Sequence, residues 1–216
     1  VNVVGLLRGA ERPLADEVIV VGAHYDHLGA GDHSSRDATS TTQIHNGADD
    51  NASGTAMVIE MAHAAARQRA RFKRSVVFVA FAGEELNLLG SRHYVRHAPI
   101  SIRRTVAMIN LDMVGRARGR VLIGGTGAQG AFQKILEEVR AFTTLRLDDF
   151  REGYGAGASD NDPFEREKVP TLLFFTGFHD DYHRPSDDWE RIDAAGASEI
   201  AGLALAMTAR LAGAER

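Results

Sequence analysis

The sequence contains no cysteine among its 216 residues. This absence excludes disulfides, cysteine-ligated metal sites and thiol catalysis, so any metal ion would have to be bound by His, Asp and Glu. No apolar run approaches the roughly 18 residues that a membrane span requires. The formal net charge of −4 gives no indication of nucleic acid or an anionic membrane surface as a partner.

The start of the chain also lacks the charged and apolar segments of a signal peptide. Because the first residue is Val1 rather than Met, we expect a processed or trimmed chain.

The length suits one domain with a sizeable core, and we expect a single domain over residues 1–216. Continuous apolar, β-branched runs predict buried strands, whereas apolar residues at helical spacing predict helices. Strands are predicted over 1–8, 17–22, 75–81, 105–113, 121–124 and 170–176, and helices after residue 51 and over 88–97, 128–142 and 192–211. This alternation predicts an α/β fold with three α/β/α layers around a mixed, mostly parallel sheet.

Acidic and histidine residues stand where predicted buried strands end, and two further acids, Asp49 and Asp50, stand where a predicted helix begins. Ligands gather at the carboxyl ends of strands in open α/β sheets, so these residues are candidates for one metal site. The candidates in chain order are His24, Asp26, Asp49, Asp50, Glu84, Glu85, Asp112 and His183.

Two of these motifs are informative by themselves. Glu84 and Glu85 follow a fully apolar strand, so one carboxylate could bind a metal while the other faces a metal-bound water. Asp112 lies in apolar sequence, where burying a lone carboxylate costs several kcal/mol unless it is paired or coordinated. The adjacent acids Asp49 and Asp50 repel each other unless a cation is near, but they also suit a helix N-cap.

The order of motifs resembles the M28 family of zinc peptidases, which includes secreted bacterial leucine-type aminopeptidases. The resemblance covers nearly the whole chain, from residue 2 to residue 193. The matching segments are His-x-Asp at 24–26, Gly-Ala-Asp-Asp-Asn-x-Ser-Gly around 47–54, Gly-Glu-Glu at 83–85, Asn-x-Asp-Met at 110–113 and Tyr-His at 182–183.

The resemblance implies a zinc-peptidase-like fold and two zinc ions per chain. His24 and Asp112 would bind one ion, Glu85 and His183 the other, and Asp50 would bridge both.

The resemblance also implies further roles. Glu84 would be the general base, Asp26 would orient His24, and Tyr182 would help to stabilise the tetrahedral intermediate. The family often has a cis peptide bond after the bridging acid, which would fall between Asp50 and Asn51. The implied substrate is a peptide with a free N-terminus, and the implied location is secreted or periplasmic.

The chain departs from the family pattern in two respects. Asn161 stands where the family often has His, and the chain is short, without a protease-associated insert. Carboxypeptidase or dipeptidase activity is an alternative, for which Arg184 could bind the substrate carboxylate. A single-zinc enzyme resembling glutaminyl cyclases is another, and a non-catalytic domain of the transferrin-receptor type is a third.

Several aromatic residues could form the wall of an apolar pocket, although aromatic residues after strands also suit a core. These residues are Tyr154, Phe164, Phe174, Phe175 and Phe178.

Overall fold

A mixed seven-stranded sheet forms the centre of the computed structural model, which describes residues 1–31, 34–37, 43–128, 130, 132–150 and 159–213. The strands follow the spatial order β1-β3-β2-β4-β7-β5-β6. They are β1 (Val3–Leu7), β2 (Val18–His24), β3 (Ser75–Phe81), β4 (Thr105–Leu111), β5 (Arg120–Gly124), β6 (Arg146–Asp149) and β7 (Thr171–Phe175).

Most neighbouring strands are parallel. The pairs β2–β3, β2–β4, β4–β7 and β5–β6 run parallel, whereas β1–β3 and β5–β7 run antiparallel. Every residue of β2 is buried, as are those of β7, because helices cover both faces of the central strands. The predicted mixed, mostly parallel sheet is confirmed.

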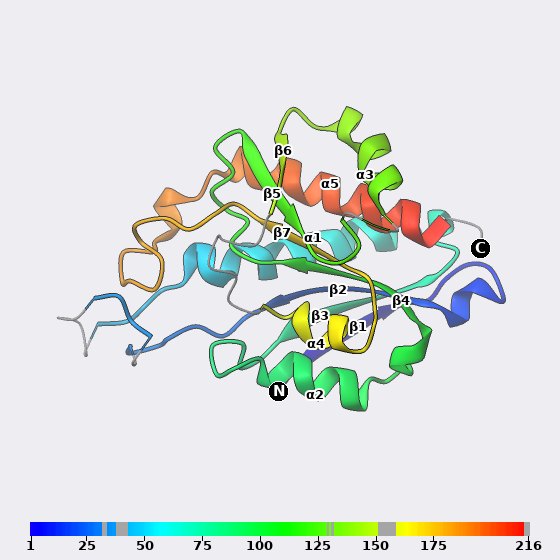
Figure 1. Ribbon diagram of the computed structural model, residues 1–216, viewed down its shortest axis with the longest axis horizontal. Coiled ribbons are helices and arrows are strands. Elements are labelled where there is room, and N and C mark those ends of the chain that lie inside the picture. Colours follow the sequence, from blue (N-terminus) through cyan, green and yellow to red (C-terminus); the bar gives the residue numbers. More distant parts are fainter. Residues whose placement is uncertain (32–33, 38–42, 129, 131, 151–158, 214–216) are drawn as a thin grey trace.

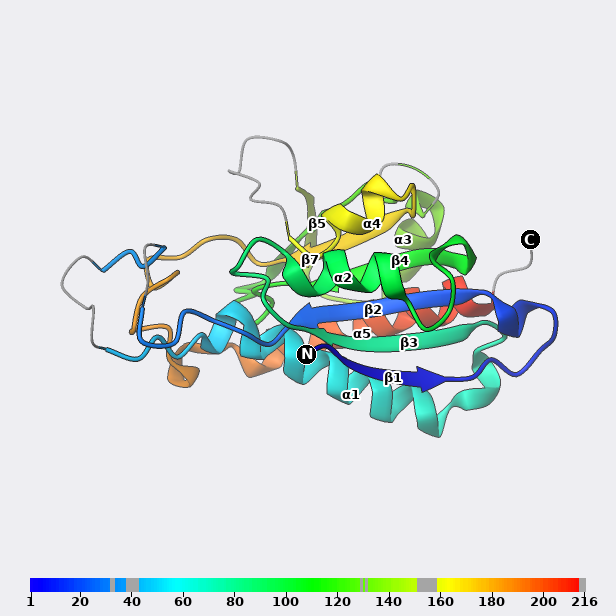
Figure 2. The same cartoon turned by 90° about the horizontal axis from the view of Figure 1, so that it is seen from below.

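The helices lie in two layers, one on each side of the sheet (Figures 1 and 2). Helices α1, α3 and α5 pack on one face in the larger hydrophobic core, and α2 and α4 pack on the other. The helices are α1 (Gly54–Arg67), α2 (Leu89–His97), α3 (Gln133–Val139), α4 (Asp162–Arg166) and α5 (Ala194–Gly213). The predicted α/β/α layering is therefore confirmed.

Helix α1 follows from both periodicity and capping. Met57, Val58, Met61 and Ala65 are buried at helical spacing against the sheet. At its start, the Asn51 side chain accepts a hydrogen bond from the backbone N–H of Gly54 (3.0 Å) and donates one to the carbonyl of Leu111 (2.9 Å). Asn51 thereby joins the start of α1 to the end of β4.

Three elements differ from the prediction. Among the described residues of the predicted 128–142 helix, α-helical structure covers Gln133–Val139 and is followed by a 3-10 turn at Arg140–Phe142. Strand β6 was not predicted, because its sequence Arg-Leu-Asp-Asp lacks an apolar run. Helix α4 was missed because it has only five residues.

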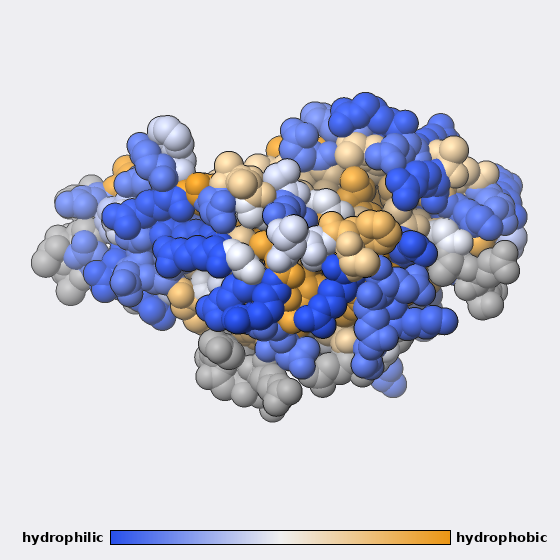
Figure 3. Space-filling model, turned by 90° about the horizontal axis from the view of Figure 1, so that it is seen from above, coloured by the Kyte–Doolittle hydropathy of each residue, from blue (hydrophilic) through white to orange (hydrophobic). Residues whose placement is uncertain are grey.

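The surface seen from the side of α5 is mostly hydrophilic, and apolar residues show mainly near its centre (Figure 3). Among the described residues, no helix combines the length and apolarity needed to cross a membrane.

The strand order determines where the candidate residues meet. Strands β3, β2, β4 and β7 are consecutive neighbours and run parallel, so their carboxyl ends share one edge of the sheet. The loops that follow β2 and β7 both extend beyond this edge (Figures 1 and 2). Residues far apart in the sequence can therefore form one site there.

Candidate metal centre

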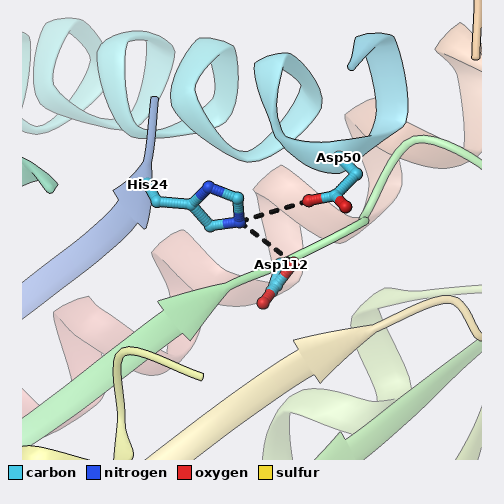
Figure 4. Close-up of side chains that lie close together, drawn as sticks. All are labelled: His24, Asp50 and Asp112. Carbon is cyan, nitrogen blue, oxygen red and sulfur yellow. Dashed lines mark ion pairs between the residues drawn. The ribbon is translucent and has the colours of Figure 1, made fainter. Parts of the chain in front are cut away.

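One group of potential ligands consists of His24, Asp50 and Asp112. His24 ends β2, Asp112 follows β4, and Asp50 lies in the turn before α1 (Figure 4). The Nε2 atom of His24 lies 3.3 Å from Oδ1 of Asp50 and 3.6 Å from Oδ1 of Asp112. These atoms are close enough to share one metal ion.

A second group forms around the other oxygen of Asp50. The Nε2 atom of His183 lies 3.3 Å from Oδ2 of Asp50 and 3.3 Å from Oε2 of Glu85. The Asp50 carboxylate thus lies between two imidazoles, with one oxygen directed at each. The structure brings together His24, Asp50, Glu85, Asp112 and His183, the full ligand set that the resemblance implied.

His27 is a member of this site that the sequence analysis missed. Its Nδ1 lies 2.9 Å from Oε1 of Glu85 and 3.8 Å from Oδ2 of Asp50, and its side chain is only 8% exposed. His27, Asp50 and Glu85 also have ligand atoms close enough for one ion. The spacing His-x-Asp-His at 24–27 was the available signal, because it places a second imidazole just past the end of β2.

Backbone carbonyls orient the two imidazoles that face Asp50. Nδ1 of His24 lies 3.0 Å from the carbonyl oxygen of Asp26, and Nδ1 of His183 lies 3.0 Å from that of Ser34. A carbonyl can only accept, so each Nδ1 carries a proton. Both Nε2 atoms are therefore directed to the ligand groups, as is typical of metal-binding histidines.

The side chain of Asp26 contacts a different part of the site. Its Oδ1 is 3.9 Å from Nδ1 of His24, beyond hydrogen-bond distance. Instead, its oxygens accept from the backbone N–H groups of Glu84 (3.1 Å) and Glu85 (3.2 Å). Asp26 thus orients His24 through its backbone and holds the Glu84–Glu85 turn through its carboxylate.

Glu84 lines the same pocket, but no described side chain donates a hydrogen bond to its carboxylate. Burial raises the pKa of Glu84 to about 9, and the nearby carboxylates of Asp112, Asp160 and Glu85 add to the effect against the opposing charge of His24. Without metal, Glu84 is therefore protonated near neutral pH. Positive charge at the neighbouring ligand groups would lower its pKa toward the range in which a carboxylate accepts a proton.

Titration of the ligand groups reflects their mutual contacts. Burial alone would lower the pKa of His24, but hydrogen bonds to Asp112 and Asp50 outweigh it, so the pKa is raised. The pKa of His183 rises to about 10 for the same reason, through Asp50 and Glu85. Without metal, protons on the imidazoles therefore balance part of the carboxylate charge.

The donor set fits divalent metal ions such as zinc. The ligand atoms are imidazole nitrogens and carboxylate oxygens, and the carboxylates outnumber the histidines, which leaves excess negative charge for cations to neutralise. Metal–ligand bonds of about 2.0–2.1 Å in a tetrahedral zinc site place ligand atoms roughly 3.3 Å apart. The separations of 3.3–3.6 Å among these groups agree with that value.

A hydrogen-bonded chain lies behind Asp112. Ser159 donates to Oδ2 of Asp112 (2.6 Å), and the Asn110 amide donates to Ser159 (2.7 Å) and to Oδ1 of Asn161 (3.4 Å). Asn161, where the family often has His, therefore lies outside the ligand set. Ligand carboxylates typically have such partners, which orient them.

One side of the pocket is aromatic. Phe150, Phe175, Phe178 and Tyr182 line it in sequence, with neighbouring ring centroids 4.8–5.5 Å apart. The Tyr182 ring also stacks on the imidazole of His183 at 3.9 Å.

The candidate wall residues have different positions. Phe175 and Phe178 line the pocket, whereas Phe164 and Phe174 are fully buried core residues. Tyr154 lies outside the described residues.

Two arginines lie near the pocket. Arg184 is exposed and does not line it. The guanidinium of Arg36 lies 4.6 Å from the Tyr182 ring centroid, and its backbone N–H donates to the carbonyl of His183 (2.9 Å).

The sequence matches the model of peptidase family M28 over residues 2–208. It is 27% identical over 219 residues to Aminopeptidase YwaD of Bacillus subtilis (strain 168), covering 95% of this chain and 43% of that protein. The chain spans less than half the length of this curated relative.

Solved structures have the same fold. The structure of BSAP, a zinc aminopeptidase from Bacillus subtilis, superposes with a TM-score of 0.77 at 26% identity, over 99% of this chain and 50% of that one. A glutaminyl cyclase from Porphyromonas gingivalis has a TM-score of 0.77 at 20% identity, over 95% of this chain and 76% of that one, which shows a common fold alone.

Proposed function

The chain belongs to peptidase family M28, and we propose that it is a two-zinc aminopeptidase that removes residues from the free N-terminus of peptides. The position of Asp50 carries this proposal. Its two carboxylate oxygens lie 3.3 Å from Nε2 of His24 and 3.3 Å from Nε2 of His183, on opposite sides of one buried side chain. A carboxylate in this position can bridge two metal ions.

In this proposal, His24 and Asp112 hold one zinc ion and Glu85 and His183 the other, with Asp50 shared. His27 donates to Glu85 and orients it. Zinc at this site would supply a Lewis acid that polarises the scissile carbonyl and lowers the pKa of the attacking water.

Glu84 would transfer the proton, and Tyr182 would stabilise the negative charge that develops on the substrate. The Glu84 carboxylate takes a proton from the attacking water and later delivers it to the leaving amine. Tyr182 lines the same pocket, and its hydroxyl can donate a hydrogen bond to the oxyanion that develops on the carbonyl oxygen.

Charge and apolar surface together favour a free, apolar N-terminal residue. The pocket contains the carboxylates of Asp50, Glu84, Glu85 and Asp112, which attract a substrate ammonium group. The aromatic wall from Phe150 to Tyr182 offers apolar surface to the side chain of that residue.

The other functions have less support. A single-zinc cyclase or a non-catalytic domain would not need the full ligand set and Glu84. A carboxypeptidase or dipeptidase needs a cation for the substrate carboxylate, and Arg184 is exposed outside the pocket. Among the described residues, Arg36 is a candidate to bind the substrate carboxylate of a dipeptidase, because its guanidinium lies 4.6 Å from the centroid of the Tyr182 ring.

The test is a comparison of substrates on zinc-loaded protein. Aminoacyl substrates with a free amine should be cleaved, and their N-acetylated forms should not. Loss of activity after chelation and its return with zinc would support the metal role. Preferred cleavage of N-blocked peptides at their C-terminus would overturn the aminopeptidase assignment. Secretion or a periplasmic location stays a prediction, which cell fractionation would test.

A further inference from the structure

A buried cluster of charged residues lies behind the candidate metal centre. Arg116 is 4% exposed, and Asp49 and Asp187 are fully buried. None of them lines the pocket, so they do not contact a substrate there. They come from three separate loops, each of which also carries a candidate metal ligand.

Asp187 binds the backbone that presents Asp50. Its backbone carbonyl accepts from the N–H of Ala48 (3.0 Å). Its side-chain Oδ2 accepts from the N–H of Asp49 (2.9 Å) and from that of Asp50 itself (3.0 Å). One residue thus holds three consecutive N–H groups that end at the candidate bridging ligand.

Arg116 fixes Asp187 in turn. Its Nη2 donates to Oδ1 of Asp187 (2.5 Å), and its Nη1 donates to Oδ2 of Asp181 (2.6 Å). Charge-assisted hydrogen bonds of this length are strong when buried. Asp181 also accepts from Ser186 (2.7 Å), so the guanidinium joins the loop after Asp112 to the loop that contains His183.

The two carboxylate oxygens of Asp49 contact groups of this region rather than the candidate metal ligands. Its Oδ1 accepts from the backbone N–H of Gly115 (2.6 Å), and its Oδ2 lies 3.1 Å from Nε2 of His179. A Cβ atom at residue 115 would lie 2.8 Å from Oδ1 of Asp49, so glycine allows this close approach. The adjacent carboxylates of Asp49 and Asp50 therefore point to different partners.

We propose that Asp187, held by Arg116, is a positioning residue that fixes the backbone at Asp50 so that the two Asp50 oxygens face the two ligand groups. This inference rests on the proposed metal centre. Because Asp50 is shared, Asp187 should influence both zinc ions together, although it touches neither ligand imidazole.

The first test uses metal-free protein and the variant Asp187→Ala. Hydrogen exchange of the segment 46–53, measured by mass spectrometry, should become at least about tenfold faster than in the wild type, because the N–H groups of Asp49 and Asp50 lose their side-chain acceptor. The control Arg74→Met removes another buried arginine, which donates to Glu17 (2.7 Å) away from the site. This control should leave exchange in 46–53 unchanged.

The second test is a zinc titration against a competing chelator. Asp187→Ala should weaken both zinc equivalents by about 10- to 100-fold, as is typical for partners of metal ligands. Asp112→Ala should weaken the affinity mainly for one zinc equivalent, and Arg74→Met should leave the affinity for both equivalents unchanged. Asp187→Asn keeps the side-chain shape and should weaken the affinity for both zinc equivalents by a smaller factor. This variant also tests the proposal if Asp187→Ala does not fold.

Unchanged exchange and unchanged zinc affinity in both Asp187 variants would overturn the positioning role. So would losses no larger than those of Arg74→Met. If the wild type itself binds no zinc, the proposed function fails, and the exchange comparison still decides whether Asp187 fixes the backbone at Asp50.

Discussion

Replacing Glu84 with Gln should separate catalysis from metal binding. Gln has nearly the same shape, and the backbone N–H of residue 84 keeps its hydrogen bond to Asp26. No described side chain donates to the Glu84 carboxylate, so the ligand groups should keep their positions. Loss of a general base typically lowers the rate by about 10²–10⁴-fold. We expect kcat to fall by that factor, or about 3–5 kcal/mol in the barrier, with zinc content unchanged.

The same variant should change the pH dependence of stability in the metal-free protein. Burial raises the pKa of Glu84 from 4.5 to about 9. Between these values the folded chain holds a proton that the unfolded chain has released, so the free energy of unfolding falls as pH rises. Glu84→Gln lacks this titration, and its metal-free form should melt at a higher temperature than the metal-free wild type at pH 8. The difference should shrink as the pH approaches 5.

The matched control is the neighbouring variant Glu85→Gln. The Glu85 carboxylate lies 3.3 Å from His183 and 2.9 Å from His27, so this variant should lose zinc affinity. The assays are steady-state kinetics on an aminoacyl substrate, elemental analysis of zinc, and thermal unfolding of chelator-treated protein. A Glu84→Gln enzyme with near-normal kcat and full zinc content would refute the role of Glu84 as base.

Other changes have equally direct outcomes. Asp50→Ala should abolish binding of both zinc ions in a chelator titration, and a variant with full occupancy would reject the bridging role. Zinc affinity should rise between pH 6 and 8, because the pKa of His183 in the metal-free protein is about 10 and zinc binding must release its proton. Calorimetry in buffers of different ionisation enthalpy measures the proton release, and pH-independent binding would contradict this expectation. Asp26→Ala removes the acceptor of two backbone N–H groups. It should lower the melting temperature and lower kcat by about tenfold. An unchanged kcat would mean that the Glu84–Glu85 turn does not need this acceptor. Phe178→Ala should raise KM for substrates with a large apolar N-terminal residue more than for alanyl substrates, and an equal change for both would exclude a contact with that side chain.

Buried strands were predictable because helices cover both faces of the central sheet. Such strands have continuous apolar runs, and β3 at Ser75–Phe81 matches its predicted range. Strand β6 lies at the edge of the sheet and is partly exposed, so its sequence carries no such run. The missing apolar run explains why β6 was not predicted, because the other edge strand, β1, is also exposed but was predicted from its apolar sequence.

Most ligand candidates were predictable because they are charged or imidazole side chains at or after the ends of buried strands, and Asp50 was predictable as an acid at the start of a helical pattern. The cis peptide bond between Asp50 and Asn51, which the resemblance implied, is present. Arg116 and Asp187 gave no such signal, because they are separated by 71 positions and each alone suits an exposed loop. Their pairing depends on how the loops after β4 and β7 fold back on each other.

Zinc bound per chain is the most direct test of a two-metal centre. The protein would be reconstituted with zinc, desalted and measured by elemental analysis. Shared ligation by Asp50 predicts about two zinc ions per chain in the wild type. About one ion would contradict the bridged centre and favour a single-zinc enzyme, and no bound zinc would contradict the metal site altogether.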